Sequence, residues 1–402
     1  MLIYFKNFNI EKFNSLIIVL FTISISFSSA LSNIFFAILC ISTIIDYLIN
    51  RNVFETKNIN YPFYFLFFLL IFTSLNALFQ GTYSANKGLW KFLPILCIGS
   101  FLFLSKRKLD IDLIKKVSIT TSVFFVFLCL IRTFIFYSNN HYIPFANGNE
   151  MVEILKIHRP YLGFYILLNI IFSFNLYNTS KHKLYKFLYG LVICVLFAFI
   201  SLISARLSIL SFIIITITYI LFYLKISFIK KVSFSLISLI SLFCLVYTNP
   251  NIRERLNHNN IELLIDYEPR VVIWESVYNI KHNDDFKSFL GYGNYQLIED
   301  YLVINYEILI DKKDKKDYYV SERFNTHSQF FDYFLFGGYP ALLLFLFFCL
   351  TSLWITRKSF YSFAIVLAFI LFFLVENVFH RQLGCYLFIL YFIISLRKDQ
   401  VK

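Results

Sequence analysis

Apolar residues in this chain form long runs that are separated by short polar connections. A bilayer core about 30 Å thick requires roughly 20 apolar residues in a helix that rises 1.5 Å per residue. The predicted spans lie near Ser15–Ala30, Asn33–Ile49, Tyr61–Phe79, Leu89–Leu104, Val117–Tyr137, Pro160–Tyr177, Tyr185–Ile203, Leu207–Leu224, Val232–Thr248, Phe330–Ile355, Phe360–Val375 and Leu383–Leu396. The pattern therefore predicts an all-α integral membrane protein with about 12 transmembrane helices.

Composition agrees with this pattern, since 58% of the 402 residues are hydrophobic and only 15% are charged. A soluble domain contains about 45–50% apolar and about 25% charged residues. The seven cysteines all lie inside apolar runs, and none has metal-ligand spacing to another Cys or to His. We therefore expect no metal site and interpret the cysteines as small apolar side chains.

Positive charge follows the connections between spans. If the N-terminus is cytoplasmic, every inner connection is basic, and the inner segments hold more than half of the Lys and Arg residues. The sequence thus predicts that both termini are cytoplasmic. The net charge of +13 is then a signal of topology, and nucleic-acid binding is not expected.

One long polar segment, Asn249 to Gln329, interrupts the spans on the predicted outer face. It divides the chain into residues 1–248 with nine spans, a loop at 249–329 with short helices, and residues 330–402 with three spans. Its aromatic and aliphatic content argues against a disordered linker. We expect it to pack over the mouth of the bundle.

Two features of this loop have a predicted structure. Pro269 to His282 fits a short amphipathic helix, and we predict that its buried side contains Val271, Trp274, Val277 and Tyr278. The run from Asp311 to Asp317 alternates Asp and Lys, and we expect a mobile, solvated tip there.

Three ionisable residues near the predicted outer surface are candidates for chemistry. Arg206 stands between two apolar runs with almost no loop, so it either reaches to interfacial water or faces a phosphate. Arg270 follows Pro269 in the first turn of a helix, where free N–H groups favour an anion, although a surface Arg would look the same. His327 precedes an apolar helix and can act as a general base near neutral pH, although a lone His is more often structural.

These segments together resemble the O-antigen ligase and O-antigen polymerase family of bacterial membrane glycosyltransferases. The resemblance covers roughly Ser201 to Gly384 and looser features near His158-Arg159-Pro160. Its motifs are Ser204-Ala205-Arg206-Leu207-Ser208, Arg270 with Trp274, Phe289-Leu290-Gly291-Tyr292-Gly293-Asn294, His327-Ser328 and Phe336-Gly337-Gly338-Tyr339-Pro340. The family usually has His-Asn where this chain has His-Ser, which puts a contact by that Asn in doubt.

The resemblance implies a donor glycan on a polyprenyl diphosphate and a lipid-A core or other glycan acceptor, at the outer face of the bacterial inner membrane. The sequence has no Walker motif, no Gly-rich phosphate loop and no clustered carboxylates, so we expect no cofactor and no metal. Arg206 and Arg270 would stabilise the leaving diphosphate. His327 would orient or deprotonate the attacking hydroxyl.

Several other residues are secondary candidates for substrate binding: His158, Arg159, Lys87, Glu376 and Arg381. Glu376 and Arg381 flank the same tight turn and could pair with each other. Lys87 could instead be an ordinary solvated Lys. His380 borders the same turn.

Three other functions remain open. A repeat-unit polymerase would use the same donor and differ in its acceptor. A transporter or flippase would place charges along a path through the membrane, whereas the polar residues here gather at one face. A structural or sensor protein is the third alternative.

Overall fold

The computed structural model describes residues 10–50, 59–105, 109–142, 148–248, 269–397 and 400. Within these ranges the secondary structure is helical, apart from an isolated bridge between Lys287 and Gly291. The all-α class expected from the apolar runs is thereby confirmed for the described residues.

The N-terminal part contains α1 (Ile10–Ser24), α2 (Ser29–Asn50), α3 (Pro62–Phe79), η3 (Tyr83–Asn86), α4 (Lys87–Ser105), α5 (Ile111–Asn140), α6 (Gly148–Leu155), α7 (Arg159–Thr179), α8 (Lys183–Leu202), α9 (Arg206–Thr218), η4 (Tyr219–Tyr223) and α10 (Phe228–Thr248). The C-terminal part contains α13 (Pro269–Ile280), α14 (Tyr295–Leu309), α15 (Lys313–Glu322), α16 (Gln329–Thr356), α17 (Phe360–Phe373), η5 (Val378–His380), α18 (Gln382–Leu387) and η6 (Phe388–Ile393).

Each predicted span overlaps one of these helices, but the count of membrane crossings is not confirmed. By length and composition, the described helices that can cross a membrane number seven: Ser29–Ile49, Pro62–Phe79, Ile111–Asn140, Arg159–Thr179, Lys183–Leu202, Arg206–Tyr223 and Gln329–Thr356. Shorter apolar helices cover Phe92–Leu104, Phe360–Phe373 and Gln382–Ile393. The chain is a multi-pass membrane protein by this criterion.

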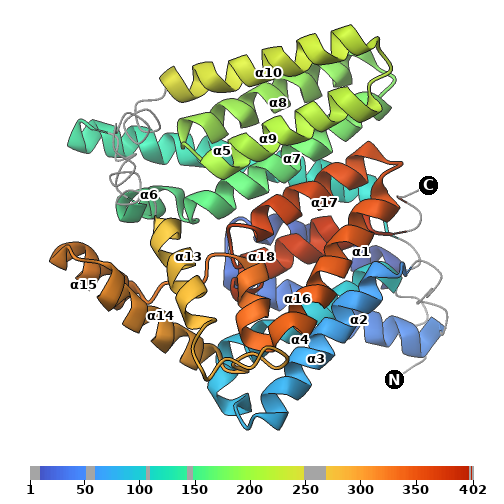
Figure 1. The fold of residues 1–402 in the computed structure, drawn as a ribbon. Helices are drawn as coiled ribbons and strands as arrows, with labels where there is room; N and C mark the ends of the chain where they lie inside the picture. The colour runs from blue at the N-terminus through green and yellow to red at the C-terminus, as the bar shows by residue number, and fades with distance from the viewer. Residues whose placement is uncertain are drawn as a thin grey trace.

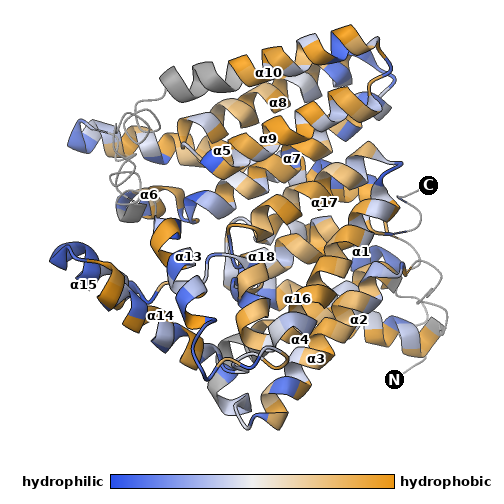
Figure 2. Cartoon of the chain, viewed as in Figure 1, coloured by the Kyte–Doolittle hydropathy of each residue, from blue (hydrophilic) through white to orange (hydrophobic). Residues whose placement is uncertain are grey.

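The long helices form two groups (Figure 1). Helices α5, α7, α8, α9 and α10 lie together in one group, and α1 to α4 lie with α16 and α18 in the other. Helix α17 contacts both groups, because it packs against α7 and α9 as well as α16. Hydrophobic residues cover the visible faces of the long helices, and hydrophilic residues gather on α14, α15 and the connecting loops (Figure 2).

A sharp kink divides α16 at Gly337 and Gly338. Gly338 has φ 65° and ψ −161°, a conformation open essentially to Gly alone, and its missing Cβ would lie 2.4 Å from the carbonyl oxygen of Ser288. The N–H of Tyr339 donates to that same oxygen at 2.9 Å. The kink therefore lets the chain before α14 lie directly against the α16 backbone.

The Gly-Tyr-Gly motif makes the other half of this contact. The N–H groups of Tyr292 and Gly293 donate to the carbonyls of Leu335 and Phe336, both at 2.8 Å, which the kink leaves without helical partners. Asn76 of α3 also donates to Phe336 O at 3.2 Å. The two glycine motifs thus join the 269–328 segment to the helices.

One expectation for the 249–329 segment is corrected. The buried side of α13 contains Val272, Ile273, Ser276, Val277 and Ile280. Of the predicted face, Val271 and Tyr278 are instead 38% and 59% exposed. Apolar residues occupy most sides of α13, so contact with α14, and not periodicity, selects the buried side.

The charged run at 311–317 is largely exposed, as expected of a solvated segment, and its residues from Lys313 onward begin α15. Tyr319 anchors this helix: it is 2% exposed, and its ring lies 5.5 Å from that of Tyr306 in α14. Residues 249–268 of the predicted loop lie outside the described residues.

Candidate functional site

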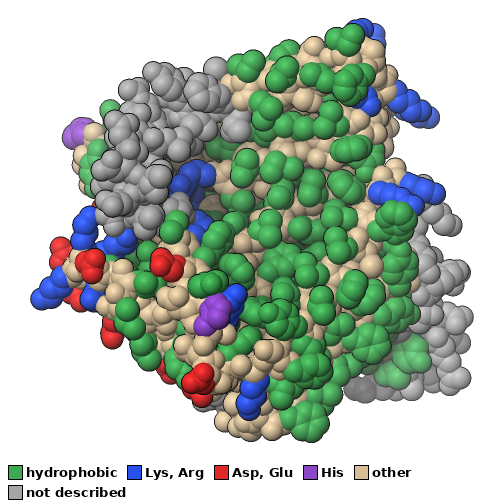
Figure 3. Space-filling view, viewed as in Figure 1, with side chains coloured by type: hydrophobic (Ala, Val, Ile, Leu, Met, Phe, Trp, Pro, Cys, Tyr) green, Lys and Arg blue, Asp and Glu red, His purple; other side chains and the backbone are tan. Residues whose placement is uncertain are grey.

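A cavity of about 720 Å³ opens where α7, α9, α13, the end of α15 and the turn after α17 meet. Its lining includes the arginines Arg159, Arg206, Arg270, Arg323 and Arg381, the histidines His158 and His327, and the carboxylates Glu322 and Glu376. Figure 3 shows Lys and Arg side chains beside a hollow in this face of the molecule. Segments more than 200 residues apart in the sequence therefore build one strongly cationic cavity.

Three helices begin at this cavity with an arginine in the first turn. Arg159 begins α7, Arg206 begins α9, and Arg270 is the second residue of α13. A helix N-terminus carries free N–H groups and partial positive charge, so a cation there opposes the helix dipole. Three helix starts and three arginines at one cavity favour an anion there.

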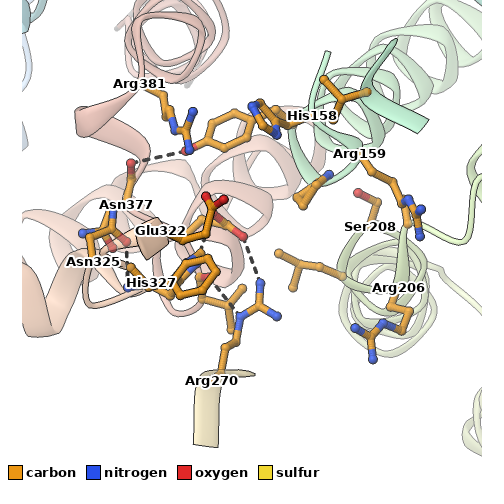
Figure 4. Close-up of a pocket in the computed structure, with 18 of the residues that line it drawn as sticks. His158, Arg159, Arg206, Ser208, Arg270, Glu322, Asn325, His327, Asn377 and Arg381 are labelled. Atoms are coloured by element: carbon orange, nitrogen blue, oxygen red, sulfur yellow. Dashed lines mark hydrogen bonds and ion pairs between the residues drawn. The ribbon is translucent and has the colours of Figure 1, made fainter. Parts of the chain in front are cut away.

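The starts of α7 and α9 are held close by Gly163. A Cβ at this glycine would lie 2.4 Å from Ala205 Cβ and 2.8 Å from Ser208 Oγ. Only glycine therefore permits this approach of the two helices, which brings Arg159 and Arg206 to the same wall of the cavity (Figure 4).

On the facing side, Glu376 connects Arg270 and His327. Arg270 Nη2 lies 2.9 Å from Glu376 Oε1, and Arg270 Nε donates to Val375 O at 3.3 Å. Glu376 Oε2 lies 3.8 Å from His327 Nδ1, a nitrogen with no hydrogen-bond partner among the described residues. Burial acts to raise the pKa of Glu376, but His327 and Arg270 together hold it below its ordinary value. The carboxylate is therefore charged at neutral pH.

A buried carboxylate, Asp332, fixes the turn that carries Glu376. It accepts hydrogen bonds from Asn377 Nδ2 at 2.9 Å and Tyr295 Oη at 2.9 Å, and it lies 2.8 Å from His380 Nε2. Asn377 in turn donates to Thr326, the neighbour of His327, at 3.0 Å. Burial acts to lower the pKa of His380, but Asp332 raises it above its ordinary value overall. One network thus positions both Glu376 and His327.

Sequence analysis missed Asp332. The available signal was an acidic residue in the first turn of an apolar helix, where a charge without a partner is costly. Its partners come from α14 and from the 375–381 turn, which the sequence alone could not bring together.

Three non-glycine residues that line the cavity have positive φ: Ser204 at 52°, Arg323 at 47° and His327 at 44°. The left-handed region costs roughly 1–2 kcal/mol for each such residue. Such backbone strain persists where the surrounding structure over-determines it, and it is common at functional sites.

Seven of the candidate residues from the sequence line this cavity, whereas His380, which borders the same turn, is not in its lining. Arg206, Arg270 and His327 lie together there, as do His158, Arg159, Glu376 and Arg381. The side chain of Lys87 lies outside the described part of the structure. Their chemical roles stay predictions. The expected pair between Glu376 and Arg381 is wrong, because Glu376 pairs with Arg270, which α13 brings over the turn.

The charge of Arg381 instead affects the pKa of His158. Burial, and next to it the charge of Arg381, lower the pKa of His158 below its ordinary value. His158 is therefore a neutral imidazole at neutral pH, at the start of α7.

Fold and cavity define a multi-pass helical membrane protein with a cationic site at one end of its helices. Residues 189–346 match the family model described as O-antigen ligase (Wzy_C). This segment is thus similar to the O-antigen ligase family, which confirms the resemblance drawn from the motifs. The match includes Arg206, Arg270 and His327 and ends before Glu376. A search of curated proteins gave no match to the chain.

Proposed function

We propose that this protein transfers a glycan from a polyprenyl-diphosphate donor to a lipid-A core or another surface acceptor, without a metal or a cofactor. The observation that carries the proposal is the convergence of five arginines and His327 on one cavity in a chain with an O-antigen ligase domain. In the reaction, the bond from the anomeric carbon to the diphosphate oxygen breaks, and its electron pair leaves with the diphosphate. The acceptor hydroxyl forms the new bond and gives its proton to His327.

Arg206 and Arg159 stabilise the leaving diphosphate in this proposal. Both begin helices on the same wall, so two guanidinium forks and the positive ends of two helix dipoles act on the same anion in this proposal. A single preorganised donor at a developing oxyanion contributes about 3–4 kcal/mol to the transition state. Lys would supply the charge at either position but would not supply the bidentate geometry.

His327 acts as the general base, and Glu376 stabilises the imidazolium that forms. The 3.8 Å between Nδ1 and Oε2 leaves the other ring nitrogen for the acceptor hydroxyl. Arg270 holds Glu376 in place through its 2.9 Å contact, so its role includes positioning as well as charge.

A deletion strain tests the function and separates it from the polymerase alternative. If the protein is a ligase, the strain accumulates polymer on the lipid donor and loses it from the surface acceptor on a gel. If it is a polymerase, single repeats remain on the acceptor. Complementation with His327→Ala should fail, and complementation with wild type should succeed in the presence of a chelator. A deletion strain whose surface glycan is unchanged contradicts both the ligase and the polymerase function.

The same proposal places the protein in the bacterial inner membrane with both termini cytoplasmic and the cavity on the outer face. A reporter fused after Lys183 should be cytoplasmic, and a reporter within the Asp311–Asp317 run should be external. An external signal after Lys183 reverses the orientation and rejects this location of the site.

A further inference from the structure

The cavity has two chemically unlike walls. Arg159 and Arg206 form a cationic wall at the starts of α7 and α9 (Figure 4). The end of α15 and the chain after it contribute Tyr318, Glu322 and Phe324 to the lining, which add aromatic rings and a carboxylate, together with Arg323, which pairs with Asp300. We call Tyr318, Glu322 and Phe324 the α15 wall. Binding a diphosphate does not require aromatic rings or a carboxylate at this wall.

The aromatic rings of the α15 wall form a row of contacts that ends at His327, the proposed base. The ring centroids of Tyr318 and Phe324 are 5.5 Å apart, and those of Phe324 and His327 are 5.8 Å apart. Behind them, Tyr319 lies 5.2 Å from Phe324, and the Tyr306 hydroxyl donates to Phe324 O at 2.9 Å. The rings are therefore backed by a packed core, while Tyr318 is 50% exposed.

A sugar ring matches these groups. Its C–H face packs on aromatic rings, whose faces are electron-rich, and its hydroxyl edge requires nearby acceptors and donors. Glu322 supplies a carboxylate at the same wall, and Asn325 supplies an amide. A carboxylate here accepts hydrogen bonds from hydroxyl or ammonium groups and repels an anionic sugar.

The reaction geometry decides which sugar binds there. In a direct displacement, the attacking hydroxyl and the leaving phosphate oxygen lie on opposite sides of the anomeric carbon. Arg206 lies across the cavity from His327 (Figure 4). The leaving diphosphate therefore lies on the Arg206 side of the anomeric carbon, and the attacking hydroxyl lies on the His327 side. The α15 wall continues from His327 and is therefore on the side of the attacking hydroxyl.

We infer that Tyr318, Glu322 and Phe324 form an acceptor subsite that binds an uncharged or amino sugar. This inference rests on the proposed function and adds the acceptor class that the function leaves open. Tyr318 and Phe324 hold the ring of the acceptor next to His327, and Glu322 selects against a uronic acid or a phosphosugar.

The test uses the full-length protein in nanodiscs with a synthetic short-chain polyprenyl-diphosphate N-acetylglucosamine as donor. The acceptor probes are octyl glucoside, octyl glucosaminide and octyl glucuronide. Tyr318→Ala should raise the acceptor KM about tenfold while donor KM and donor hydrolysis stay within about twofold, and Tyr318→Phe should restore the KM. The matched control is Tyr278→Ala, an exposed tyrosine of α13 that is not part of the cavity lining.

Specificity provides the second readout. Wild type should use the glucoside and the glucosaminide in preference to the glucuronide, and Glu322→Gln should reduce that preference about tenfold. The subsite is overturned if Tyr318→Ala changes donor KM as much as acceptor KM, if the glucuronide is the best acceptor of wild type, or if wild type hydrolyses the donor but transfers to none of the three. A wild type that neither hydrolyses nor transfers contradicts the proposed function itself.

Discussion

The ion pair between Arg270 and Glu376 should couple the two residues strongly, because it is largely buried. The side chains are 25% and 9% exposed, and the atoms Nη2 and Oε1 are 2.9 Å apart. Two unit charges about 4 Å apart attract by roughly 4 kcal/mol at an effective dielectric constant of about 20. Partial exposure of Arg270 reduces this value, so we expect a coupling of about 2 kcal/mol.

A double-mutant cycle measures this coupling. Arg270→Ala leaves a buried carboxylate without its cation and should reduce the free energy of unfolding by about 3 kcal/mol. Adding Glu376→Gln removes that isolated charge, so the double variant should lose about 2 kcal/mol less than the sum of the single variants. Unfolding is followed by tryptophan fluorescence as a denaturing detergent is titrated into micelles.

A second ion pair in the same segment is the control. Arg323 and Asp300 pair with side chains that are 41% and 48% exposed, so their coupling should be below about 0.5 kcal/mol. The reasoning is refuted if Arg270 and Glu376 are additive within about 0.5 kcal/mol. The pKa of Glu376 is lowered in the folded protein, so its contribution is present above its ordinary pKa and is lost as the pH falls through the lowered value.

Three further predictions follow from the site. Gly163→Leu should separate α7 from α9 and cost about 1–3 kcal/mol of stability, whereas Gly190→Leu should be close to neutral in thermal unfolding, because a Cβ there meets no atom nearer than 4.0 Å. Arg206→Lys should lower donor turnover at least about tenfold and leave the melting temperature unchanged. Asp332→Asn should cost about 3 kcal/mol. Because the pKa of His380 is raised, that loss should shrink as the pH rises through the raised value.

The helices could be predicted from the sequence because the signal for them is local. An apolar run of a span's length has few alternatives to a helix in a membrane, and each predicted span overlaps a helix. The side of α13 that is buried was not predictable in the same way. Val271 and Val272 are equally apolar, and packing against α14 decides that Val272 is inside.

Several residues that line the cavity could be predicted from the sequence, but the contacts between them could not. Arg206, Arg270 and His327 could be singled out because they lie near the predicted outer surface in segments that resemble one family, and the structure brings them to one cavity. Which carboxylate pairs with Arg270 depends on how α13 folds over a turn more than 100 residues later. Arg381 is only five residues from Glu376 in sequence, yet Glu376 forms its ion pair with Arg270.

The charges at the starts of α7 and α9 favour an anion at that wall of the cavity. Arg159 and Arg206 each stand at a helix end where a cation is unfavourable by about 0.3–1 kcal/mol. Gly163 then brings these two helix starts together, so two cationic ends share one wall of the cavity. A fold selected for stability alone would place acidic residues at these positions. In the proposed reaction, a diphosphate between the helix starts would offset this cost, and the gain would be largest as the diphosphate leaves the sugar and its charge is greatest.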